Sequence, residues 1–245
     1  YRNIVNDLFD DRSDKLNKLY DDYEDRIMMQ PASSIAHFHN AFAGGYVDHV
    51  LRVMDCVEKL YDTWRDMGAD MSGYTGKEML FAAMHHDLGK CGFPGDGNEV
   101  YQVETSDWHR KNMGRMYKHN ENIPFTMVPD LSLFLLQKYE VPMSWNEYQA
   151  IRIHDGVYDD ANKPYFIART AQAKLKTNLP LLLHHADHMA SQIEYEKWRN
   201  RKNNSPNPVS AKAKSTKSTA LKNLAEQNPE INKSIADIFS TFKEG

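Results

Sequence analysis

A histidine and an aspartate stand next to each other at the end of an apolar helical segment. Thr75 and Glu78 have the spacing of a capping box, so a helix is expected to begin there and to run through the apolar residues 79–84 into His86 and Asp87. An imidazole beside a carboxylate is costly to bury unless other groups compensate both. The fold must therefore bring further polar groups to the inner end of this helix.

The rest of the chain also shows helical patterns. Apolar residues at helical spacing predict one or two amphipathic helices within residues 1–30 and a longer helix from Tyr46 to about Met67. Further helices are expected to begin near Ser106, at Ser144, where Glu147 completes a second capping box, and around Asn178. Because no segment shows convincing strand alternation, we expect an all-α protein built as a compact helical bundle.

The expected organisation has three parts with different charge. Residues 1–36 form an N-terminal helical extension packed on the core, residues 37–200 form the main domain, and residues 201–245 form a flexible linker with a short C-terminal helix near residues 231–242. The last part carries eight Lys/Arg and four Asp/Glu, which leaves residues 1–200 at a net charge of -8 within the total of -4. An acidic body of this kind disfavours long nucleic acid as a partner.

Nothing in the sequence predicts attachment to a membrane. No apolar run approaches the roughly 18 residues that a membrane-spanning helix needs, and the acidic N-terminal residues do not resemble a signal peptide. We therefore expect a cytoplasmic protein without a membrane partner. A homo-oligomer is compatible with the sequence.

Histidine and aspartate recur where the expected helices end or where an apolar stripe turns inward. Besides the pair His86 and Asp87, this pattern includes His49, His109, His154 and Asp187. A divalent cation would compensate such buried groups directly. Imidazole together with carboxylate suits Fe, Mn, Co, Ni or Zn, whereas Mg prefers a site richer in oxygen. The expected cofactor is therefore one or two divalent transition-metal ions.

Three segments resemble the motifs of the HD-domain superfamily of metal-dependent phosphohydrolases: GGYVDH at residues 44–49, AMHHDLGK at 83–90 and HAD at 185–187. The whole chain resembles uncharacterised HD proteins of large tailed bacteriophages, which implies the host cytoplasm but names no substrate. The resemblance implies an HD-domain helical bundle. It also implies a set of metal ligands, to which binuclear members of the superfamily add two histidines: His49, His86, Asp87, His109, His154 and Asp187.

The function implied by this resemblance is hydrolysis of a nucleotide or another small phosphate ester by a metal-activated water. Asp87 is expected to orient that water, Asp155 to accept its proton, and Lys90 to meet a phosphate oxygen. Other residues are candidates for binding the substrate through charge or hydrogen bonds: Arg52, Arg110 and His185. Several aromatic residues are candidates for stacking on a base: Phe93, Tyr101, Trp108, Tyr158 and Tyr165.

Alternative interpretations of the same residues stay open. A mixed-valent diiron oxygenase would use the same ligand set, and Asp155 follows His154 where many binuclear phosphodiesterases have a second histidine. A binding protein that senses a nucleotide is a further alternative, motivated by the basic C-terminal residues. His109, His154 and Lys90 could also serve only to cap helix ends.

Overall fold

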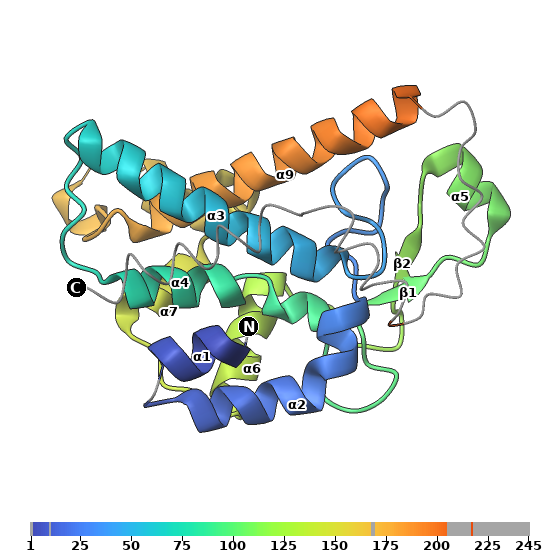
Figure 1. Cartoon of the computed structure of the whole chain (residues 1–245), viewed down its shortest axis with the longest axis horizontal. Helices are drawn as coiled ribbons and strands as arrows, with labels where there is room; N and C mark the ends of the chain where they lie inside the picture. Colours follow the sequence, from blue (N-terminus) through green and yellow to red (C-terminus); the bar gives the residue numbers. More distant parts are fainter. Residues whose placement is uncertain (1, 10, 168–169, 205–216, 218–245) are drawn as a thin grey trace.

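The computed structural model describes residues 2–9, 11–167, 170–204 and 217, and confirms a mostly helical fold. Figure 1 shows the helices gathered into one body, with a small β-hairpin at one end. The described residues form these α-helices: α1 (Arg2–Leu8), α2 (Ser13–Met29), α3 (Gly45–Asp66), α4 (Gly76–His85), α5 (Asp107–Met113), α6 (Val128–Lys138), α7 (Trp145–Arg152), α8 (Lys163–Ile167) and α9 (Leu179–Asn204).

Both predicted capping boxes are present. The Glu78 amide donates to Thr75 Oγ1 at 3.2 Å at the start of α4, and the Glu147 amide donates to Ser144 Oγ at 3.2 Å at the start of α7. The Ser144 hydroxyl also donates to Glu78 Oε1 at 2.5 Å. The two caps therefore satisfy free amides at each helix start and tie α4 to α7.

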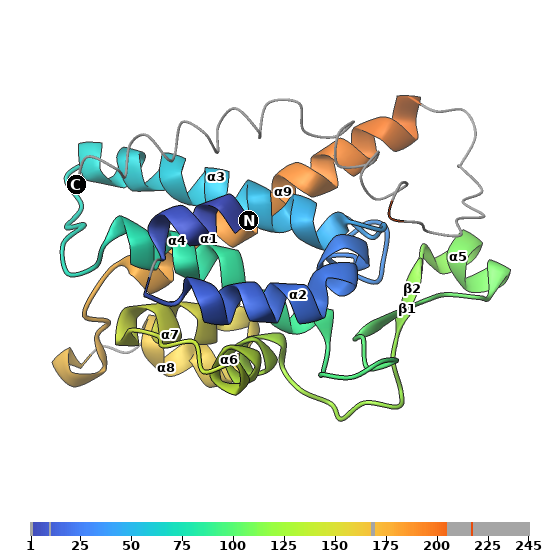
Figure 2. The ribbon, with the colours of Figure 1, turned by 60° about the horizontal axis from the view of Figure 1, so that its bottom comes forward.

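The two longest helices, α3 and α9, lie side by side, and α4 and α7 pack against them (Figures 1 and 2). The apolar faces of these helices meet in one core that includes fully buried residues from each of them: Val53, Met54, Phe81, Ile151, Leu182 and Leu183. Burying these faces supplies the main stabilisation of such a bundle.

The N-terminal helices α1 and α2 are part of this core. Val5, Leu16 and Leu19 are fully buried, and α2 packs against α3. Arg12 makes a bidentate ion pair with Glu147 at 2.9 and 2.6 Å, and its guanidinium lies 3.9 Å from the centre of the Phe81 ring. The predicted N-terminal extension is therefore anchored by a buried charge pair as well as by apolar packing.

A two-stranded antiparallel hairpin departs from the all-helical expectation. Strands β1 (Tyr101–Val103) and β2 (Tyr117–His119) pair with Gln102 opposite Lys118, and α5 is carried between them. In both views the hairpin and α5 extend away from α4 and α7 (Figures 1 and 2). Three-residue strands are too short to show an alternating pattern, which is why the sequence did not reveal them.

Helix α9 continues to Asn204, past the boundary predicted at residue 200. The short helix expected near residues 231–242 lies outside the described residues. Among the described residues, no helix has the length and apolar character needed to cross a membrane.

Candidate metal centre

His86 and Asp87 follow directly after α4 and provide the first part of the site. His86 Nδ1 lies 2.9 Å from the Ala83 carbonyl oxygen, and a proton shared there leaves Nε2 free to face inward. The buried Ser132 hydroxyl holds the turn that follows, because it accepts from the Gly89 amide at 2.7 Å and donates to the His86 carbonyl at 2.9 Å. Asp87 is thereby fixed beside His86 at the inner end of the helix.

His49 lies in the second turn of α3, and the turn before this helix is built around two glycines. Gly44 has a φ of 87°, and a Cβ on Gly45 would lie 2.0 Å from the Asn40 carbonyl oxygen. His49 Nδ1 lies 3.2 Å from both carboxylate oxygens of Glu194 on α9. This contact turns His49 Nε2 toward Asp87, at 3.4 Å, and toward Asp187, at 3.0 Å.

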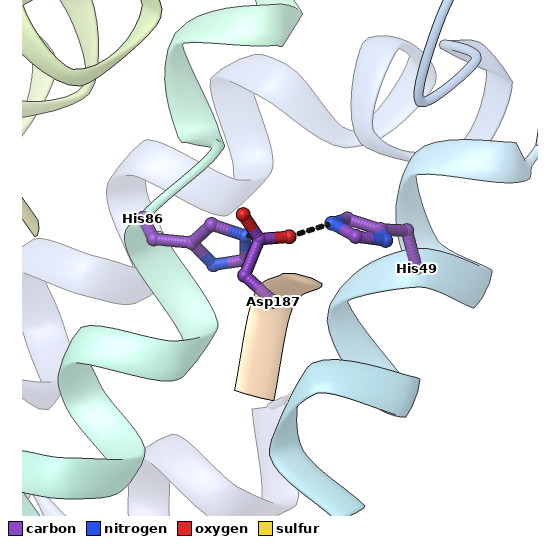
Figure 3. Close-up of side chains that lie close together, drawn as sticks. All are labelled: His49, His86 and Asp187. Carbon is purple, nitrogen blue, oxygen red and sulfur yellow. Dashed lines mark ion pairs between the residues drawn. The ribbon is translucent and has the colours of Figure 1, made fainter. Parts of the chain in front are cut away.

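Asp187 comes from α9 and lies between the histidines of two other helices. Figure 3 shows its carboxylate between the rings of His49 and His86. Asp187 Oδ1 is 3.0 Å from His49 Nε2 and 3.9 Å from His86 Nε2. Residues from α3, from the C-terminal end of α4 and from α9 therefore bring one donor atom each close together.

His154 completes the cluster from the turn after α7. Its Nδ1 lies 2.8 Å from the Ile151 carbonyl oxygen, and its Nε2 lies 3.7 Å from Asp87 Oδ1. Gly156, two residues after His154, is required in this turn. Its φ is 59°, and an added Cβ would lie 2.2 Å from the ring of His184. His184 Nδ1 in turn lies 2.8 Å from the His154 carbonyl oxygen, which fixes the turn.

These donors form two groups that share His86. The Nε2 and carboxylate atoms of His49, His86 and Asp187 all lie within 4.8 Å of one another, as do those of His86, Asp87 and His154. His49 Nε2 and His86 Nε2 are buried, and neither has a hydrogen-bond partner of acceptable geometry among the described residues. Buried polar atoms without partners are costly. The cluster therefore fits a metal ion, since these buried histidines and aspartates could hold one with nitrogen and oxygen donors.

The charges in the cluster are strongly coupled. Burial alone would lower the pKa of His49, but the negative charges of Glu194 and Asp187 outweigh it and raise that pKa to about 10. Burial likewise opposes the raised pKa of about 9 at His154, which faces Asp87 and Asp155. Burial dominates at His86, whose pKa falls to about 4. In the metal-free protein, protons on His49 and His154 thus balance the carboxylates.

The two residues predicted to assist catalysis lie beside the cluster. Lys90 Nζ is 2.5 Å from Asp87 Oδ2, and the Asp87 charge raises the pKa of Lys90 against the effect of burial. Asp155 Oδ1 is 3.7 Å from His154 Nε2. Burial and the neighbouring charges of Asp87 and Asp187 raise the pKa of Asp155. A carboxyl with a raised pKa in such a position is suited to accept a proton.

A cleft of about 570 Å³ opens onto the cluster and shares His154, Asp155 and Asp187 with it. The volume is within the range of small-molecule sites. Of the aromatic residues predicted to stack on a substrate, Tyr158 lines this cleft and is 78% exposed. Tyr158 belongs to the 3-10 helix η2 (Gly156–Tyr158). Further lining residues come from the loop before α3 and from α9, and include Phe38, His39, His184, His188, Gln192 and Tyr195.

Four predicted site residues lie elsewhere or have other partners. His109 is on α5, where its Nδ1 lies 3.5 Å from Glu104 Oε2, and the structure does not bring it to the cluster. Arg110 pairs with Asp107 on the same helix. The exposed His185 packs against Trp64, with 5.6 Å between ring centres. Arg52 is buried in ion pairs at 3.3 Å with Asp48 and 3.2 Å with Glu194, and it does not line the cleft.

Sequence reasoning missed Glu194, which supports the cluster from α9. Glu194 follows Asp187 by seven residues, which places both on one face of the helix. His184 and His188 lie four residues apart on α9 and line the cleft beside Asp187, whereas His185, the predicted substrate-binding residue, does not line it. The spacing of these positions was visible in the sequence, but which face of α9 turns inward depends on its packing against α3.

No protein-family model matches the chain, and no match was found among curated proteins or solved structures. The three motif-like segments and the geometry of the cluster are therefore the grounds for any functional proposal.

Proposed function

We propose that this protein is an HD-type, metal-dependent phosphohydrolase that acts on a nucleotide or another small phosphate ester. The observation that carries the proposal is the gathering of three histidine Nε2 atoms and two carboxylates into two groups of donors that share His86, beside a cleft. The residues that would hold the metal come from all three motif-like segments and from the turn after α7: His49, His86, Asp87, Asp187 and His154.

A divalent transition metal bound there would lower the pKa of a water molecule and neutralise charge that develops on the phosphoryl oxygens. Asp155 is placed at the cleft to take the proton from the attacking water on its carboxylate. Lys90 contributes a fixed positive charge beside Asp87, which offsets part of the negative charge of the carboxylates near an anionic substrate. The exposed rings of Phe38 and Tyr158 give an organic substituent a surface for stacking.

The position of His109 favours hydrolysis over the diiron oxygenase. That alternative calls for six protein ligands, and five of them meet here. The two donor groups share His86, and His109 lies on α5 beside Glu104. A set of donors with one shared histidine supports a single metal ion better than a pair.

The test is phosphate release from a panel of nucleoside mono-, di- and triphosphates by protein stripped with a chelator and then supplied with Mn, Co, Fe, Zn or Mg in turn. We expect release that needs an added metal and disappears in Asp87→Asn. Asp66→Asn, which alters a largely exposed carboxylate at the end of α3, serves as the matched control and should retain full activity. Equal release by wild type and Asp87→Asn, or none with any metal, would overturn the proposal; two bound irons with oxygen consumption would replace it with the oxygenase.

A further inference from the structure

A buried polar chain lies behind His49, on the side away from the metal cluster. Both Glu194 oxygens lie 3.2 Å from His49 Nδ1, and Glu194 Oε1 also accepts from Arg52 Nε at 3.2 Å. Arg52 Nη2 continues the chain to Asp48 Oδ2 at 3.3 Å, and this oxygen accepts from Asn40 Nδ2 at 2.6 Å. The Glu194 side chain has no exposed surface, so it interacts with these protein groups instead of water.

Burying the Glu194 carboxylate costs free energy, and neighbouring groups must offset this cost. Arg52 alone does not account for Glu194, because Asp48 already gives the guanidinium one carboxylate partner on its own helix. Glu194 also determines which nitrogen of the His49 ring carries a proton and which has a free lone pair. When Nδ1 donates its proton to Glu194, Nε2 is left as the nitrogen with a lone pair, and it faces Asp87 and Asp187.

A carboxylate behind a histidine also affects the strength of the opposite nitrogen as a ligand. An ionised acceptor at Nδ1 holds the ring in one orientation and increases electron density at Nε2, and loss of such a partner typically weakens metal binding about 10- to 100-fold. Glu194 and Asp187 stand two turns apart on the same face of α9. One rigid helix therefore supplies a donor to the cluster and the group that orients a donor from α3.

We infer that Glu194 is a positioning residue of the metal centre: it holds the His49 ring through Nδ1 so that Nε2 binds the cation. This inference rests on the proposed metal site. Glu194 does not touch the cation or the substrate, and it acts only through His49. A purely structural role would predict a contribution to stability through Arg52 and none to metal affinity.

The experiment measures metal affinity and metal-free melting temperature for the full chain carrying Glu194→Gln or Glu194→Met, with Zn as the probe in a chelator competition. The amide of Gln still accepts a hydrogen bond but lacks the charge, whereas Met removes the acceptor. We expect affinity about tenfold weaker in Glu194→Gln and about a hundredfold weaker in Glu194→Met. Glu196→Gln, an exposed change on the same helix, should bind as wild type does.

A second measurement keeps the inference testable if both variants fail to fold. Nitrogen-15 NMR of the zinc-loaded wild type should show His49 protonated at Nδ1 and not at Nε2; the opposite tautomer would overturn the inference. Unchanged affinity in a folded Glu194→Met variant would also overturn it while leaving the proposed metal site intact. Failure of wild type to bind any cation would instead refute the metal site itself.

Discussion

Metal binding should release protons, because two of the ligand histidines hold a proton in the metal-free protein. The pKa of His49 is raised to about 10 and that of His154 to about 9, so both are protonated at pH 7. The pKa of His86, lowered to about 4, leaves that ring neutral. A cation bound to all three Nε2 atoms must displace the protons of His49 and His154 but none from His86. The structure thus predicts about two protons released per cation.

The sign and size of the pH effect follow from this count. Raising the pH removes a competitor of the cation, so affinity increases with pH, by about a hundredfold per unit while both groups are protonated. The increase should flatten above pH 9, where His154 has lost its proton, and end near pH 10. Lowering the pH from 7 to 6 should weaken binding by the same hundredfold.

The assay is isothermal titration calorimetry with a transition-metal ion in two buffers of different ionisation enthalpy, which gives the number of protons released. Wild type should release about two protons at pH 7, and His154→Gln should release about one, because His49 still contributes its own. Metal binding to wild type without proton release, or a metal affinity that stays constant between pH 6 and 8, would contradict the protonation of His49 and His154.

Three further predictions concern the framework of the site. Gly156→Ala should lower the stability of the protein more than Gly68→Ala does, and it should weaken metal binding. Both glycines have a positive φ, but only at Gly156 would the added Cβ meet the His184 ring. Equal urea midpoints and equal metal affinities of the two variants would contradict this prediction. Arg12→Ala should destabilise the protein by about 3–5 kcal/mol, because the buried Glu147 carboxylate loses its positively charged partner. The exposed control Arg65→Ala should leave the urea midpoint close to that of wild type. Ser132→Ala should cost about 2 kcal/mol in urea unfolding, because the Gly89 amide and His86 carbonyl lose their shared partner; a cost near zero would show that water replaces the hydroxyl.

Local signals in the sequence were enough to predict most of the helical framework. The capping boxes at Thr75 and Ser144 fix where α4 and α7 begin, and the apolar stripe after Tyr46 predicts α3 to within one or two residues. These features depend on residues within one or two helical turns. For the same reason the buried His86 and Asp87 could be recognised, since their cost is evident from the apolar residues just before them.

The rest of the site depends on contacts between distant segments. Glu194 is one of several charged residues on α9, and its burial depends on Arg52, which lies 142 positions earlier in the chain. His109 lies between the His86–Asp87 pair and Asp187 in the sequence, which suggested a metal ligand. In the structure β1 pairs with β2, and α5 between them lies away from the cluster. Neither the register of two three-residue strands nor the inward face of α9 is encoded in a local pattern.

The most direct test of the metal centre is anomalous X-ray diffraction from crystals loaded with manganese or zinc, with data collected on both sides of the absorption edge of the metal. We predict an anomalous peak bounded by His49, His86, Asp87, His154 and Asp187. An ordered cluster without a peak at full metal loading, or a peak only elsewhere on the protein, would contradict the proposal that these residues form a metal centre.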